Sequence, residues 1–135
     1  MVLDRSEAIV AAWLAKLHAT ALDLGSLDAA FDEDWPELPA VKLDLVKRNL
    51  HAFMGYYYRV VFDPDPTLSD APVVGDVGDD LLDTYSDVKK GLLAYGPEGN
   101  EAARWFWSYM HRMHWGQHVV GALTALNGAA RKVED

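Results

Sequence analysis

The apolar residues of the chain recur at spacings of three and four, which is the period of an amphipathic helix. Four segments carry this pattern, so we predict helices over residues 4–24, 40–60, 76–95 and 100–127. Asn127-Gly128 is expected to end the last helix with a left-handed residue. Apolar and polar residues nowhere alternate over a length that predicts a strand.

The segments between the predicted helices are rich in helix-breaking residues. The stretch from Ser26 to Pro39 combines acids with prolines, and Phe62 to Gly75 contains three prolines. Proline lacks a backbone donor and biases the residue before it away from the helical region, so both stretches are predicted to be loops. The expected fold class is all-α: one domain over residues 1–135, a bundle of about four main helices with a long Pro-rich loop between helices two and three.

Composition narrows the classes of function. The chain has 135 residues, half of them apolar, which suits one hydrophobic core. A net charge of -9 leaves no basic surface for nucleic acid or an anionic membrane. Cysteine is absent, which excludes disulfides and thiolate chemistry. The sequence shows neither a signal peptide nor an apolar stretch of membrane-spanning length, so we expect a soluble cytoplasmic protein.

Three histidines stand close together in the last predicted helix. His111, His114 and His118 have spacings of three and four, which place them on one stripe of a helix. His114 and His118, at i and i+4, could offer two imidazoles to zinc, iron or nickel. The same stripe also carries Gly121 and Ala125, which suits hydrogen-bonded histidines in a tight helix contact. Both interpretations remain open from the spacing alone.

An acidic stripe on the third predicted helix supplies candidate partners for these histidines. Asp76, Asp80, Asp83 and Asp87 repeat at spacings of four, three and four. Apolar residues lie on nearly the opposite side, so the simplest expectation is that the aspartates face water. Burial against the last helix would instead require histidine, arginine or a metal as partner, because unpaired buried carboxylates are costly.

The last predicted helix is apolar on nearly all sides, which predicts burial or a subunit interface. We expect self-association through this helix, with Trp105, Trp107 and Trp115 as interface residues. His18 and His51 lie off the apolar stripes of their helices and are expected at the surface.

Two regions together resemble the bacterial family called domain of unknown function 5063. The motifs are DDLLDTYSDVKKGL at 79–92, Trp105 and Trp107, and HWGQHVVGAL at 114–123, with Tyr57 and Phe62-Asp63-Pro64 before them. The resemblance covers about the C-terminal two thirds of the chain. It implies a small helical protein with no assigned activity. In the family pattern the position of His111 is usually apolar, whereas a larger set of polar positions is matched: Asp80, Asp83, Asp87, His114 and His118.

A looser resemblance is to four-helix metal-binding proteins of the DinB and YfiT type. These carry a histidine on helix two and a His-x-x-x-His-Arg-Gly-Gln run on a later helix. The run His114-Trp115-Gly116-Gln117 is similar to the end of that motif, but Met110 stands in place of its first histidine. His51 is predicted on the polar face of helix two, so the likeness remains an analogy.

The sequence therefore supports two hypotheses and assigns no reaction. The first is an interaction or assembly protein in which Asp80, Asp83, Asp87, His114 and His118 form a structural polar network. The second is a metal-binding bundle or metal-dependent enzyme in which His114 and His118 bind a divalent transition metal together with Asp83 and Asp87. No other cofactor and no small-molecule ligand is indicated.

Overall fold

The computed structural model describes residues 5–24, 40–95 and 100–131. Within these ranges the chain is mainly helical, which confirms the predicted helical bundle. The α-helices are α1 (Arg5–Leu24), α2 (Ala40–Asn49), α3 (Val77–Ala94), α4 (Asn100–Met110) and α5 (Gly116–Arg131). A 3-10 turn, η1 (His51–Phe53), follows α2, and a π-helical turn, η2 (His111–Trp115), joins α4 to α5. Two short strands are β1 (Tyr57–Val60) and β2 (Val73–Asp76).

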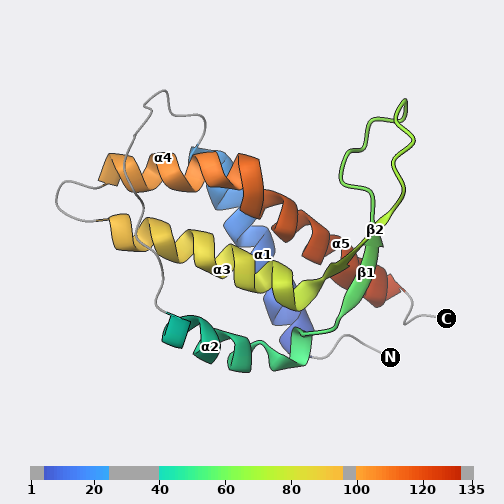
Figure 1. The fold of residues 1–135 in the computed structure, drawn as a ribbon, viewed down its shortest axis with the longest axis horizontal. Coiled ribbons are helices and arrows are strands. Elements are labelled where there is room, and N and C mark those ends of the chain that lie inside the picture. The colour runs from blue at the N-terminus through green and yellow to red at the C-terminus, as the bar shows by residue number, and fades with distance from the viewer. Residues whose placement is uncertain (1–4, 25–39, 96–99, 132–135) are drawn as a thin grey trace.

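Helix α3 lies among the other helices and packs against both α4 and α5, while α1 also packs on these two (Figure 1). Apolar residues that recur at helical spacing meet in the middle and exclude water, which is the main source of stability in such a bundle. The buried core consists of Leu14, Ala21, Phe53, Val77, Trp115, Val119, Ala122, Ala125 and Leu126. Among the described residues, no helix is long and apolar enough to span a membrane.

The prediction that the chain has no strands is wrong. Strands β1 and β2 pair antiparallel, with Tyr57 opposite Asp76 and Val60 opposite Val73. Along β1 the side chains alternate between exposed and half-buried, because only one face of the hairpin lies against the helices. The Pro-rich segment 61–72 connects the strands and is exposed throughout.

The second predicted helix is correspondingly shorter than expected. It ends at Asn49 instead of residue 60, and Gly55 then adopts a φ of 80°. This left-handed conformation is open to glycine at little cost and turns the chain into β1. The residues that follow are aromatic and β-branched, which favours an extended strand over a helix.

The last predicted helix is longer and less regular than expected. It continues past Gly128 to Arg131, and it is interrupted by η2 at His111–Trp115. In η2 the Gly116 amide bonds to the His111 carbonyl, five residues back. A π-turn adds a residue to one turn and changes the direction in which the preceding side chains point. The helical rod bends at this position in Figure 1.

Candidate metal centre

Two aspartates of the acidic stripe on α3, Asp80 and Asp87, are buried against the last helices, which corrects the expectation that they face water; the Asp83 side chain is 43 % exposed. Asp80 is 4 % exposed and Asp87 3 %. The reason is that other segments pack on more than one side of α3. Val77 of α3 belongs to the hydrophobic core, and Gly91 of α3 is buried against Trp107 of α4. Thr84 lies between the two aspartates, and its buried hydroxyl has no hydrogen-bond partner among the described residues.

Each buried aspartate meets one histidine of the last helices. The Nδ1 atom of His114 lies 2.6 Å from Oδ2 of Asp87, and Nδ1 of His118 lies 2.7 Å from Oδ1 of Asp80. A carboxylate accepts only, so Nδ1 of each ring carries the proton. In the neutral tautomer each Nε2 atom therefore has a free lone pair.

The two free ring nitrogens point toward one another. His114 Nε2 and His118 Nε2 are 3.3 Å apart, with the rings nearly perpendicular. Asp83 adds a carboxylate oxygen 3.3 Å from His118 Nε2. One donor atom from each of these three residues lies within 4.8 Å of the others. Three electron-pair donors thus face one small volume, and their mutual repulsion favours a cation between them.

Two of the three separations between the donors match those of a metal site. Two atoms 3.3 Å apart, each about 2.1 Å from one ion, subtend roughly 104° at that ion, close to the tetrahedral angle of about 109°. This separation is found both between the two imidazoles and between His118 and Asp83. A zinc-sized ion therefore suits each of these two pairs. His114 and Asp83 have donor atoms within 4.8 Å of one another, and all three residues bind one ion only if this separation is no more than about 4.2 Å.

One side of this cluster is open to solvent. The side chains of His114 and Asp83 are 42 % and 43 % exposed, whereas the aspartates behind the imidazoles are buried. Three protein donors and an open side are the arrangement that leaves a coordination position for water.

The environment of His118 favours its protonated form when no metal is bound. The hydrogen bond to Asp80 raises the pKa of His118, and the charges of Asp83, Asp80 and Asp87 act in the same direction. Burial opposes these effects but does not cancel them. A proton and a metal ion therefore compete for this ring.

Tyr58 supports the Asp80–His118 pair from the hairpin. Its hydroxyl donates to Oδ2 of Asp80 over 2.5 Å, while Oδ1 of Asp80 accepts a hydrogen bond from Nδ1 of His118. Burial and the bond to Asp80 raise the pKa of Tyr58, so the phenol stays protonated. A Cβ on Gly75 or on Gly121 would overlap the Tyr58 side chain, so both glycines make room for it.

Tyr58 is not among the site residues predicted from the sequence, because residues 40–60 were expected to form one helix. The useful signal would have been the alternation within the short run from Tyr57 to Val60, which places Tyr58 and Val60 on one face. The other half of the hairpin also helps to hold α3. Asp76 caps α3 by accepting from the Gly78 amide over 2.8 Å, and it also accepts from Gly55.

His111 lies apart from the other two histidines of the run. It is buried, its ring contacts that of Trp115 edge to face, and its Nε2 lies 2.9 Å from Nδ1 of His18. A regular helix would place all three histidines within one sector, but the π-turn at His111–Trp115 changes their relative directions. His18, expected at the surface, is instead half-buried in this contact, whereas His51 is exposed.

The three tryptophans assigned to an interface have different environments. Trp115 is buried in the core of this chain, and its Nε1 donates to the carbonyl of Trp107. Trp107 donates to the Val88 carbonyl on α3. Trp105 stacks on Tyr109 with ring centroids 5.0 Å apart. The indoles of Trp107 and Trp115 therefore contribute to packing within the chain.

Comparison with known families accounts for most of the chain. The profile of the family described as Domain of unknown function (DUF5063) matches residues 8–130. The chain belongs to this family. The match includes α1, which the resemblance seen in the sequence did not cover. Neither a curated protein nor a solved structure matches the chain at a significant level.

Proposed function

We propose that this protein binds one divalent transition metal ion. Its ligands are Nε2 of His114, Nε2 of His118 and the carboxylate of Asp83. Asp87 and Asp80 hold the two imidazoles through Nδ1. In the hypothesis drawn from the sequence Asp87 was a ligand; here it orients one.

One observation carries the proposal: both imidazoles are tied at Nδ1 to buried carboxylates, and both direct Nε2 at the same point. Metal-binding histidines usually donate their second ring nitrogen to a carboxylate or carbonyl, which fixes the tautomer and strengthens the ligand. Two such pairs side by side give a prepared donor set. A purely structural network would place two lone pairs 3.3 Å apart unless a proton lay between them.

The donor set favours some metals over others. Two imidazoles and one carboxylate suit zinc, iron, cobalt, nickel or manganese, whereas magnesium and calcium prefer oxygen ligands only. The open side would hold one or more waters. A metal so placed lowers the pKa of bound water and can polarise a substrate oxygen.

The test is a metal titration of protein purified without an affinity tag and stripped with a chelator. We expect one equivalent of zinc or cobalt, and for cobalt the visible absorption typical of low coordination numbers. The double variant His114→Ala/His118→Ala should bind none. His51→Ala is the matched control, because His51 is exposed and outside the cluster.

Less than about a tenth of an equivalent bound by the wild-type protein would overturn the proposal. Equal binding by the wild type and the double variant would do so as well. Either result would leave the structural Asp/His network as the better account of these residues.

We also propose self-association through the last helical rod, at residues other than the tryptophans expected from the sequence. Trp115 is inside the core, but three other apolar residues of the same helical rod are exposed: Tyr109, Met113 and Val120. Met113 is the most exposed of them, at 64 %. Light scattering after size-exclusion chromatography should give twice the monomer mass, and Met113→Glu should shift it toward the monomer. A monomeric wild-type protein would refute this proposal.

A further inference from the structure

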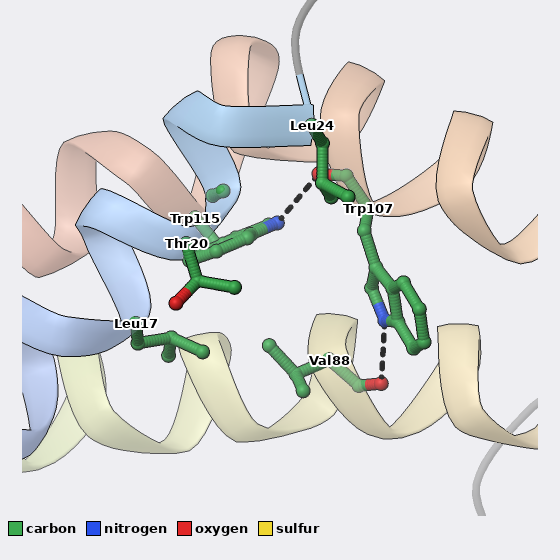
Figure 2. Close-up of a pocket in the computed structure, with 7 residues that line it drawn as sticks. Leu17, Thr20, Leu24, Val88, Trp107 and Trp115 are labelled. Atoms are coloured by element: carbon green, nitrogen blue, oxygen red, sulfur yellow. Dashed lines mark hydrogen bonds between the residues drawn. The ribbon is translucent and has the colours of Figure 1, made fainter.

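We infer that the protein has a second site, which binds a small uncharged aromatic or aliphatic molecule. This site is a pocket of about 210 Å³ between α1, α3 and the α4–η2 segment, open to solvent on one side. Figure 2 shows the two indoles and the side chains of α1 and α3 around it. The lining consists of Leu17, Thr20, Ala21, Leu24, Val88, Trp107 and Trp115.

The polar groups of this lining already have partners. The Thr20 hydroxyl donates to the Lys16 carbonyl of its own helix over 2.8 Å. The indole N–H of Trp107 donates to the Val88 carbonyl over 3.0 Å, and that of Trp115 donates to the Trp107 carbonyl over 3.2 Å. The lining contains no charged side chain.

Because these polar groups are already hydrogen-bonded, the lining favours one chemical class of ligand. Water that enters the pocket finds no free polar partner in the lining, so it is held there weakly and is easily displaced. An anion or a cation would lose its hydration without compensation. An uncharged apolar molecule has no hydrogen bonds with water to give up, and it gains contact with the two indole rings.

The size of the cavity sets the size of the occupant. An apolar cavity of about 150 Å³ in another protein is large enough for benzene. The present cavity of about 210 Å³ therefore admits a molecule with roughly six to ten carbon atoms. Toluene and similar single-ring compounds fall within this range.

The same hydrogen bonds keep the cavity open. Gly91 has no side chain, and a Cβ there would overlap the indole of Trp107, so the glycine lets this ring lie against α3. Both indoles are then fixed by backbone carbonyls, and neither ring can turn into the cavity without breaking its bond. In Figure 2 Trp107 extends toward α3 along one side, while Trp115 lies across from Val88.

Toluene is the probe for this site, and benzoate is its charged counterpart. Toluene should bind the metal-free protein with a dissociation constant of about 0.1–1 mM, as expected for a ligand of seven carbon atoms. Benzoate should bind at least about ten times more weakly. Because the site is independent of the metal, toluene should bind the His114→Ala/His118→Ala variant equally well.

Two further measurements locate the site. Ala21→Leu adds a side chain into the cavity and should weaken toluene binding at least about tenfold. Ala15→Leu makes the same change on the exposed side of α1 and should leave binding within about twofold. In the wild-type protein, nuclear Overhauser effects should connect toluene with the methyl groups of Leu17 and Val88, which identifies the site even if Ala21→Leu does not fold.

The inference is wrong if the wild-type protein binds no toluene at millimolar concentration. It is also wrong if the Overhauser effects point to other residues, or if folded Ala21→Leu binds toluene as well as the wild type does. A failed metal titration would leave these outcomes unaffected.

Discussion

Two pairs of histidines in this protein have ring nitrogens at similar distances, but the pairs differ in their hydrogen-bond partners. His114 and His118 approach to 3.3 Å between their Nε2 atoms, and His18 and His111 approach to 2.9 Å between Nδ1 and Nε2. In the first pair each ring also contacts a buried aspartate. The interaction shown for the second pair is between the rings themselves, so one nitrogen can donate and the other accept.

The difference shows that histidine spacing alone does not define a metal site. In the His18–His111 pair a single N–H satisfies both nitrogens, and no cation is needed. In the His114–His118 pair the aspartates take the Nδ1–H groups, so a further proton or a metal ion is needed between the two Nε2 atoms. The electrostatics agree: the bond to Asp80 raises the pKa of His118, whereas burial and the neighbouring His18 lower the pKa of His111.

The largest expected difference in zinc affinity is between two variants that each remove one histidine, one from each pair. His118→Ala should weaken zinc binding on the order of a thousandfold, because a ligand is lost. His18→Ala should leave the affinity within about threefold, since His18 lies outside the donor set. Competition with a chelating dye measures both. Comparable losses in the two variants would remove the distinction between the pairs.

A smaller effect is expected from the aspartates behind the imidazoles. Asp87→Asn and Asp80→Asn should each weaken zinc binding by about 10- to 100-fold, as is typical for residues that orient a ligand. Asp79→Asn is the control, because it removes the same charge from an exposed position on the same helix. If all three variants lose affinity equally, general electrostatics explains the effect and the orienting role is refuted.

The hairpin should support only the His114–His118 pair, because Tyr58 of β1 donates to Asp80, the partner of His118. Tyr58→Phe removes the donor to Asp80 and leaves a buried carboxylate oxygen without it, at a cost of about 1–3 kcal/mol in the free energy of unfolding. Tyr57→Phe, on the exposed face of the same strand, should cost less than about 0.5 kcal/mol. Urea denaturation of the metal-free protein measures both. Equal stability of the two variants would contradict the support attributed to Tyr58.

The smallest effect is an opposite pH dependence of the two pairs in the metal-free protein. The raised pKa of His118 means that its protonation stabilises the fold below the ordinary value of 6.5, and this stabilisation is lost as pH rises through the folded value. The lowered pKa of His111 means that the unfolded chain takes up the proton more readily, so stability is lost as pH falls below 6.5.

Two variants test these signs. The stability advantage of the wild type over His118→Gln should be larger at about pH 6 than at about pH 8.5. The advantage over His111→Gln should be smaller at about pH 6 than at about pH 8.5. Denaturant midpoints at the two pH values, measured with a chelator present, provide the comparison. Slopes of the same sign would show that the two pairs do not differ in this respect.

The helical fold could be predicted from the sequence because helix formation is local. Apolar spacing of three and four marks α1, α3 and the last helical rod whatever their neighbours are. The hairpin was missed because a four-residue strand has little pattern of its own. Strand β1 depends on β2, whose paired residues lie 13 positions later for Val60 and Val73 and 19 positions later for Tyr57 and Asp76. The π-turn at His111–Trp115 was missed because regular helical geometry was assumed there.

The sequence by itself determined which residues could take part in a site: an acidic stripe on one helix and histidines four apart on another. Only the tertiary structure decided that Asp80 and Asp87 are buried, and that Asp80 pairs with His118 and Asp87 with His114. The family resemblance had already set His111 aside, and the structure places it against His18. The physical reason is that helix periodicity fixes which side chains share a face. Which face meets which neighbour, and with what burial, depends on packing between segments far apart in the chain.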